Sequence, residues 1–410
     1  MTQRQPARKS QPALIRQIDD LTLKEVLDSH TRYRTGVPGG RRANLAYFDL
    51  SNRVLMAADL SDAEMTGVRL QGATLNGAQL DRAVLFGADL READLREASL
   101  QRADLRGACL RGANLASADL RQCDLREGLI ALQDPVNGFR ILSHEKKTGE
   151  LDYAVLSGAN LAGAQMNGTL ALSADFRDAD LSQAVMNGAR LRNACLDGAD
   201  LSGASLAGAD LSGASLKRAN LTGAAVNDAT LTGADLSGVL RAPPPIFYID
   251  DQPLDELVSG HEAWCDTQGL RGAPAKLAEV DFRTLKTLKG RRLTAVNAPR
   301  SIFFRLDMRG VELQGADLSG SDLRAVDLRD ADLRGAKLMD AQLTRADLRG
   351  AKLGPLEIAP GRHVRTDLSR ADLRQADLRG ASARRARFFE AELASARLDG
   401  CDLAFAEMEA

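Results

Sequence analysis

The sequence predicts an all-β solenoid in two tandem segments, each preceded by a short α-helical cap. Three observations lead to this prediction: an apolar residue recurs at every fifth position over most of the 410 residues, a helical segment occurs twice, and large rings are scarce. The chain has 11 Phe, 4 Tyr and 1 Trp against 36 Gly, so its core must be thin and built mainly from Leu and Ala. A period of five matches neither an α-helix nor a simple strand, and it indicates a chain that winds.

The repeat itself defines which side chains point inward. From Leu45 to Ile130 every fifth residue, here called the centre, is apolar, and a small residue stands two positions before it, as in the run FGADLREADLREASL. We expect the small residue and the centre to face the interior and the residue between them to face outward. The two residues after the centre would form a corner, where the frequent Gly at the second position takes a positive φ without steric cost.

The A(D/N)LxG run resembles that of the pentapeptide-repeat proteins, and the resemblance extends over most of the chain. It implies a right-handed quadrilateral β-helix with four repeats, about 20 residues, in each coil. Stacked coils would lie about 4.8 Å apart, the spacing of strands in a sheet.

Shifts in phase divide the chain into segments. The second run is one residue out of phase with the first, and the third keeps a strict phase from Leu288 to Met408 in which only His363 is polar. The turn signals Asp134-Pro135 and Asn137-Gly138 mark the first interruption. The predicted segments are an N-terminal tail and capping helix (1–40), run 1 (41–130), a protruding loop or hairpin (131–150), run 2 (151–240), a Pro-rich linker with a second capping helix (241–287) and run 3 (288–410).

The two predicted caps are an internal duplication, since residues 254–277 repeat residues 23–45. Their apolar residues have helical spacing, with a capping box expected at Thr22 and Glu25 and Pro253 near the first turn of the second helix. Each helix precedes a run whose first coil would otherwise expose unpaired strand edges. The alternative is one continuous rod with the second helix looped out. The matched pairs are Leu23 with Leu254, Val26 with Leu257, Leu27 with Val258, His30 with His261 and Tyr33 with Trp264.

Nothing in the sequence predicts catalysis. A filled β-helix offers no pocket where titratable groups converge, so we expect no enzymatic activity, no catalytic residue, no cofactor and no metal site. The five cysteines are widely spread and contain no CxxC pair, which argues against a disulfide framework or a zinc site. We expect His30 and His261 to pack within the caps and His363 to lie in a surface loop.

Opposite charges are predicted to run side by side. The net charge is -2 from 54 basic and 56 acidic residues, so no bulk field attracts nucleic acid or an anionic membrane, and we expect neither as a partner. Some family members that protect bacterial topoisomerases imitate DNA, which requires an uncompensated acidic face. Compensated rows therefore disfavour a topoisomerase as the partner. The expected rows are Asp307, Asp327, Asp347 and Asp367 beside Arg309, Arg329 and Arg349, and these three arginines are candidate contacts.

The remaining candidate contacts are Phe389, Phe405 and Asn137. The two rings should point outward on the last coils, where no helix follows, so the C-terminal coil is expected to pair with a second copy as a homodimer. The alternative is a frayed, locally shielded end.

No apolar run reaches the roughly 18 residues of a membrane span, and the N-terminus lacks a signal sequence, which predicts a cytoplasmic protein. The predicted function is a scaffold or rigid binding surface for an unidentified protein partner; the alternative is a DNA-mimic modulator of gyrase.

Overall fold

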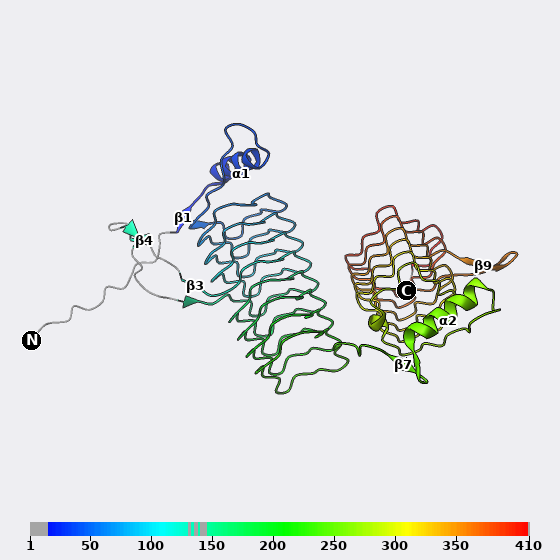
Figure 1. The fold of residues 1–410 in the computed structure, drawn as a ribbon. Helices are drawn as coiled ribbons and strands as arrows, with labels where there is room; N and C mark the ends of the chain where they lie inside the picture. Colours follow the sequence, from blue (N-terminus) through cyan, green and yellow to red (C-terminus); the bar gives the residue numbers. More distant parts are fainter. Residues whose placement is uncertain (1–14, 130–132, 135–137, 140–145, 409–410) are drawn as a thin grey trace, which may run out of the picture. The chain divides into compact units, whose positions relative to one another are not determined.

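The computed structural model describes residues 15–129, 133–134, 138–139 and 146–408. The chain divides into two compact units, unit 1 (residues 1–242) and unit 2 (residues 243–410). Each unit is a stack of coils that follows a single longer helix (Figure 1). Among the described residues, no helix is both long and apolar enough to cross a membrane.

Each coil contains four pentapeptides. Parallel bridges join residues twenty positions apart, as in Asn44 with Glu64 and Glu64 with Val84. In a typical repeat Ala103 and Leu105 are buried while Asp104 between them is half-buried at the surface, as the pattern predicts. The backbone N–H of Leu105 donates to the carbonyl of the next coil at 2.8 Å, and the same bond recurs at centre after centre. Neighbouring coils are thereby joined at each of their four repeats.

The corners explain the glycine pattern. The second corner residue has a positive φ both where it is Gly, as at Gly87 (φ 63°), and where it is not, as at Arg102 (φ 58°). The outward residue before the centre helps to close the corner, since the Asp104 carboxylate accepts a hydrogen bond from the backbone N–H of Arg106 at 3.2 Å. This bond is the Asx turn that Asp and Asn favour, which accounts for their abundance at this position.

Unit 1 opens with a short strand and a helix. β1 (Arg16–Gln17) pairs in parallel with β2 (Phe48–Asp49), and α1 (Asp20–Arg34) lies at the N-terminal end of the stack (Figure 1). The predicted capping box at Thr22 is wrong, because the helix begins earlier. Its N-cap is Asp19, whose carboxylate accepts from the backbone N–H of Thr22 at 2.9 Å and from the Thr22 hydroxyl.

Runs 1 and 2 form one continuous stack in unit 1. Cys109 bridges Glu150, so the partners are forty-one residues apart instead of twenty, and an insertion leaves the coil between them. It begins with β3 (Gly128–Leu129), which pairs antiparallel with β6 (Lys146–Lys147); β4 (Gln133–Asp134) and β5 (Gly138–Phe139) pair in the same way. The insertion thus leaves the coil a few residues before the expected position 131, and Asn137 lies outside the described residues.

Unit 2 begins with a small antiparallel pair, β7 (Tyr248–Ile249) and β8 (Gln252–Pro253), followed by α2 (Leu254–Asp266). Its first bridge joins Lys276 to Asn297, so the stack starts before Leu288, where the strict phase begins. The 3-10 helix η1 (Phe282–Leu285) replaces one regular repeat in this first coil. The buried ring of Phe282 stacks on that of Phe303 with centroids 4.4 Å apart.

A hairpin interrupts unit 2 without changing its phase. It consists of β9 (Leu356–Ala359) and β10 (Arg362–Val364), which pair antiparallel. Lys337 bridges Asp367, thirty residues away, so ten extra residues, two full pentapeptides, leave the coil here. Ile358 and His363 occupy centre positions by phase, yet both are exposed on the hairpin. The prediction that His363 lies in a surface loop is confirmed, and Ile358, which the phase counts as an inward centre, is exposed as well.

Both caps dock through the same histidine contacts. His30 Nδ1 accepts from the backbone N–H of Ala43, and its Nε2 lies against the carbonyl of Ser61, both at 3.0 Å. His261 repeats the arrangement with Ala275 and Thr294, again at 3.0 Å. Both rings are fully buried, as expected for packing roles, and burial lowers the pKa of each. The duplicated sequence therefore folds into a duplicated cap.

Candidate interaction surfaces

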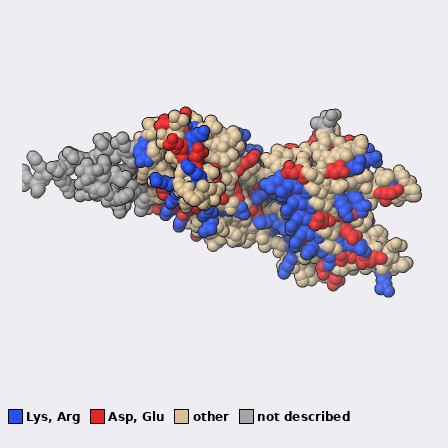
Figure 2. Space-filling view, turned by 90° about the horizontal axis from the view of Figure 1, so that it is seen from above, with Lys and Arg blue, Asp and Glu red and all other residues tan. Residues whose placement is uncertain are grey.

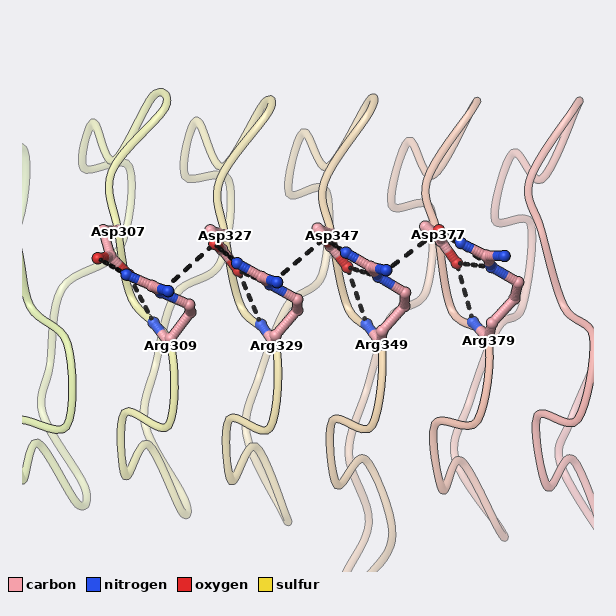
Figure 3. Close-up of polar contacts among 8 residues, drawn as sticks. All are labelled: Asp307, Arg309, Asp327, Arg329, Asp347, Arg349, Asp377 and Arg379. Carbon is pink, nitrogen blue, oxygen red and sulfur yellow. Dashed lines mark hydrogen bonds and ion pairs between the residues drawn. The ribbon is translucent and has the colours of Figure 1, made fainter.

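Opposite charges alternate along one side of unit 2. The residues involved, here called the Asp–Arg ladder, point toward one another across successive coils (Figure 3). Within each repeat the Asp Oδ2 and Arg Nη2 atoms are 2.6 to 2.7 Å apart. Between coils the Nε atoms of Arg309, Arg329 and Arg349 lie 3.6 to 3.8 Å from the Oδ2 of the next Asp. The ladder consists of Asp307, Arg309, Asp327, Arg329, Asp347, Arg349, Asp377 and Arg379.

The ladder differs from the predicted rows at one step. Asp347 bridges Asp377, and not Asp367, because the ten residues of the hairpin shift the register after Lys352. Asp367 instead bridges Lys337 and Arg387 on another side of the coil. The prediction that Asp367 extends the row is therefore wrong, and Arg379 joins the three arginines that the sequence singled out.

Each arginine of the ladder forms an ion pair with the carboxylate two residues before it. The Arg309 hydrogen bond lowers the pKa of Asp307 to about 2, and Arg329 and Arg379 likewise hold the pKa of Asp327 and Asp377 below the ordinary range. These pairs lie at the surface, where solvent screens their attraction, so each contributes little to stability. Their main effect is on the surface potential, because they leave no row of free acidic charge on this side.

The same Asp-Leu-Arg pairing recurs in both units, for example between Asp89 and Arg91 in unit 1 and between Asp372 and Arg374 in unit 2, each at 2.6 Å. Acidic and basic side chains are interspersed over the surface in Figure 2, with Lys and Arg gathered over part of unit 2. The prediction that near-zero net charge reflects local pairing is consistent with these contacts.

Phe389 and Phe405 lie at the surface of the last coils, with 42% and 73% exposure. Phe405 is a second corner residue with φ 60°. The guanidinium carbons of Arg384 and Arg385 lie 5.6 and 5.9 Å from the centre of its ring. Phe389 lies in the repeat that follows Arg384 and Arg385, and the ring that contacts their guanidinium groups is that of Phe405. The role of both rings as contacts stays a prediction.

The group of Arg384, Arg385 and Phe405 was not predicted, although the sequence contains a signal for it. Arg385 and Phe405 are twenty residues apart, one coil, so they must stack on the same corner. The segment ARRARFF also breaks the Asp-Leu-Arg pattern, because Ser382 stands where Arg384 would have its Asp. Both signals follow from the predicted coil of about 20 residues, since all three residues lie after the hairpin.

Unit 1 contains an apolar cavity and a half-buried cysteine. A cavity of about 180 Å³ opens among the last coils of unit 1, but Arg241 is the only charged residue in its lining. The described residues contain no cluster of His, Cys, Asp and Glu suited to a metal ion. Burial raises the pKa of the Cys109 thiol to about 11, which makes it a weak nucleophile. The cavity is lined by Leu206, Leu211, Leu216, Leu221, Ala224, Val226, Leu231, Leu236 and Arg241.

Comparison with known proteins identifies the repeat. The family model "Pentapeptide repeats" matches segments that together cover more than half of the chain, and a search of curated proteins finds no match. Solved structures of similar proteins include HetL, involved in heterocyst differentiation regulation, from the cyanobacterium Nostoc sp. strain PCC 7120. It is 34% identical, with 48% of this chain and 78% of HetL covered and a TM-score of 0.31. The matched segments are 41–77, 63–102, 78–115, 88–127, 173–203, 199–238, 292–324, 316–354 and 366–403.

Two further structures are similar over smaller or more divergent regions. Rfr23 from the cyanobacterium Cyanothece 51142 is 28% identical over 32% of this chain and 89% of its own, with a TM-score of 0.27. A trypsin-treated QnrB1, a plasmid-mediated fluoroquinolone resistance protein, is 19% identical over 48% of this chain and 89% of its own, with a TM-score of 0.25. With five-residue repeats confirmed in all three runs by the family model and by the bridges of the structure, the chain belongs to the pentapeptide-repeat family.

Proposed function

We propose that the chain is a non-enzymatic scaffold that presents fixed arrays of side chains to a protein partner. The observation that carries this proposal is the way outward residues are held in place. In the Asp–Arg ladder, the Asp327 carboxylate accepts from the backbone N–H of Arg329 at 3.3 Å and pairs with its guanidinium at 2.7 Å. Side chains that are already fixed lose little conformational freedom when a partner binds, so such a surface favours recognition.

The same geometry argues against an enzyme. The small residues and centres fill the interior, so catalytic groups would have to converge on the outside of the coils. The carboxylates there are engaged by their own arginines, which keeps their pKa values low and makes them poor acids or bases at neutral pH. The proposal therefore includes no catalytic residue and no cofactor.

The alternative function, modulation or protection of gyrase through DNA mimicry, needs a continuous acidic face. Duplex DNA carries one charge per about 1.7 Å of its axis. The ion pairs of the Asp–Arg ladder neutralise one acidic row of unit 2 at the spacing of the coils, which weakens this alternative for that side of unit 2. A topoisomerase therefore remains the less favoured partner.

A gyrase supercoiling assay separates the two functions. With purified chain at micromolar concentration, we expect supercoiling and its inhibition by a quinolone to be unchanged. Protection of gyrase from the quinolone, or direct inhibition of supercoiling, would make the DNA-mimic function the better one.

Cross-linking in the native host tests the scaffold function. Tagged chain should recover a defined protein, and recovery of nucleic acid alone would contradict the scaffold function.

Three finer features belong to the same proposal. We take the coils to be right-handed and quadrilateral, the protein to be cytoplasmic, and the C-terminal coil to pair with a second copy. The exposure of Phe389 and Phe405 supports the last of these. Light scattering should give twice the mass of one chain, and the double variant Phe389→Asp, Phe405→Asp should give half of that value. A monomeric wild-type protein would exclude the homodimer.

A further inference from the structure

We propose that one corner of unit 2 binds a short, extended, acidic segment of a partner protein. The corner, here called the basic corner, consists of Arg384, Arg385, Phe405 and the exposed hairpin residues from Glu357 to Val364. The inference rests on the proposed scaffold function and names the surface and the chemistry of the partner that this function requires.

These residues lie on one corner of three consecutive coils. On one adjoining side Lys352 bridges Ser382 and Ser382 bridges Asp402; on the other, Asp367 bridges Arg387 and Arg387 bridges Glu407. The hairpin, the two arginines and Phe405 therefore follow one another along the stack, about 4.8 Å apart from coil to coil. Gly354, just before the hairpin, lies beside the coil of Arg384, since the carbonyl oxygen of Arg384 is 3.8 Å from the position that a Cβ on Gly354 would take. Within the hairpin, Leu356 and the carbonyl oxygen of Val364 lie against Gly335 of the preceding coil.

The basic corner carries positive charge that the chain does not neutralise. In the Asp-Leu-Arg repeats each Arg pairs with the Asp two residues before it, but Ser382 occupies that position before Arg384. Among the described residues, neither Arg384, Arg385 nor Arg362 has an ion-pair partner. The nearby Arg365 and Arg387 behave differently, since both contact the carboxylate of Glu407.

Phe405 adds apolar surface at a place where the backbone disfavours it. Its φ of 60° lies in the left-handed region, in which bulky residues are strained. The same corner position is occupied by glycine in nearby repeats, at Gly380 and Gly400. With 73% exposure, the ring gains little from burial. Its contacts with the two guanidinium groups hold them beside an exposed aromatic face, an arrangement suited to a ligand with both acidic and apolar groups.

The hairpin offers main-chain hydrogen bonds to such a ligand. Its two strands form a sheet of their own, and no backbone hydrogen bond joins residues 357–364 to another described segment. Ile358 and Val364 are 50% and 37% exposed beside Arg362. An extended segment can add to a free strand edge through its backbone while its side chains contact the apolar and basic residues.

The surroundings favour a short acidic peptide over a long polyanion. Asp402 and Glu407 flank Phe405 on the two adjoining sides of the last coil. A nucleic acid strand that followed the stack would meet these carboxylates and the Asp residues of neighbouring repeats. Three unpaired arginines at one corner match a segment with two or three carboxylates.

Fluorescence anisotropy with the full chain at low ionic strength tests the inference. The probes are a labelled ten-residue peptide of alternating Glu and Val, the same peptide with Gln for Glu, and a ten-nucleotide oligo-dT. We expect the Glu peptide to bind about tenfold more tightly than the Gln peptide, a difference that corresponds to about two charged contacts. Equal binding of the two peptides, tighter binding of oligo-dT, or no binding of the Glu peptide would overturn it.

Two variants and a matched control locate the site. Arg384→Gln with Arg385→Gln should weaken binding of the Glu peptide about tenfold. Arg91→Gln with Arg96→Gln removes the same charge from two arginines of unit 1 that pair with their own Asp, and should change binding less than about twofold. Equal losses of binding in the two double variants would show that the peptide responds to the total charge of the chain and not to the basic corner.

Phe405→Gly should weaken binding of the Glu peptide while the melting temperature stays the same or rises, because Gly relieves the strain of the left-handed backbone. A lower melting temperature together with unchanged binding would assign Phe405 a structural role.

Two outcomes identify other occupants or separate this inference from the proposed function. The proposed homodimer is compatible with this site where it pairs through Phe389, so Phe405→Gly should leave the mass in light scattering unchanged. If Phe405→Gly alone converts a dimer into a monomer, a second copy covers the basic corner and the acidic-peptide site is excluded. If a cellular protein still co-purifies with the Arg384→Gln, Arg385→Gln variant in undiminished amount, the scaffold function stands and the basic corner is not its docking site.

Discussion

At the scale of single residues, the two buried histidines determine how each helix is attached to its first coil. Each ring accepts a backbone N–H at Nδ1, so its proton must lie on Nε2, where it can be donated to a carbonyl. A second proton would place two donors against each other at Nδ1. Arg34, Asp59 and Asp62 surround His30, while Glu262 lies near His261, yet burial dominates and lowers the pKa of both.

The caps should therefore weaken in mild acid. A histidine in the unfolded chain has a pKa of about 6.5, so the unfolded state binds more protons than the folded state as the pH falls below that value. Stability that is complete at pH 7.5 should decrease progressively toward pH 5.5. Urea unfolding at the two pH values measures this, and the variant His30→Gln, His261→Gln should show a flatter dependence. The same decrease in wild type and variant would contradict the prediction.

A glycine in each cap loop lies against the backbone of its helix. A Cβ on Gly40 would lie 2.2 Å from the backbone nitrogen of Tyr33, and one on Gly272 would lie 1.9 Å from the carbonyl oxygen of Gly260. We expect Gly40→Ala or Gly272→Ala to lower the free energy of unfolding by about 2 to 4 kcal/mol, because backbone atoms cannot move aside easily. Gly260→Ala is the control: no atom lies within 4 Å, and Ala in a helix should raise stability by about 0.5 to 1 kcal/mol. Urea denaturation measures the three free energies of unfolding, and loop variants as stable as the Gly260→Ala control would refute this explanation.

At the scale of elements, the two insertions show what periodicity can and cannot detect. The first adds twenty-one residues between Asp124 and Gln165, one more than a coil, and the shifted phase reveals it in the sequence. The second adds ten residues between Lys337 and Asp367, and the phase continues through it unchanged. The inward residues, corners and caps were predictable because each follows from local pattern. A surface loop at His363 was predictable too, but its ten extra residues and the step from Asp347 to Asp377 were not, because only the three-dimensional register distinguishes an inserted pair of repeats from a genuine one.

The hairpin should be removable. Deleting residues 355–364 would join Gly354 to Arg365, which would become the two corner residues between Leu353 and the buried Thr366. We expect the free energy of unfolding to change by less than about 1 kcal/mol, since the coil closes with its normal spacing. Deleting one residue more, 355–365, leaves a one-residue corner and should destabilise the coils that follow. Circular dichroism and urea titration compare the two deletions, and a collapse of both would show that the hairpin supports the stack.

At the scale of the whole molecule, each unit has its own helix and its own hydrophobic core. Leu23 and Ile18 belong to the core of unit 1, and Leu254 and Val258 belong to the core of unit 2. We expect residues 1–242 and 243–410 to fold separately when expressed alone, each with one cooperative transition in urea. A fragment that begins at residue 41 lacks the first helix and should aggregate, because its first coil exposes unpaired strand edges. Failure of both complete units to fold alone would contradict the division.

The Asx turns that close the corners have a consequence for the size of such molecules. Because each repeat closes its own corner and each coil bonds to the next in the same way, the middle of a stack contains nothing that fixes how many coils it has. A gain or loss of four repeats would lengthen or shorten a unit by a single step of about 4.8 Å and leave every remaining contact of the same kind. The length of each unit is thus free to vary in whole steps during evolution, and only the helix at its beginning distinguishes a first coil from any other.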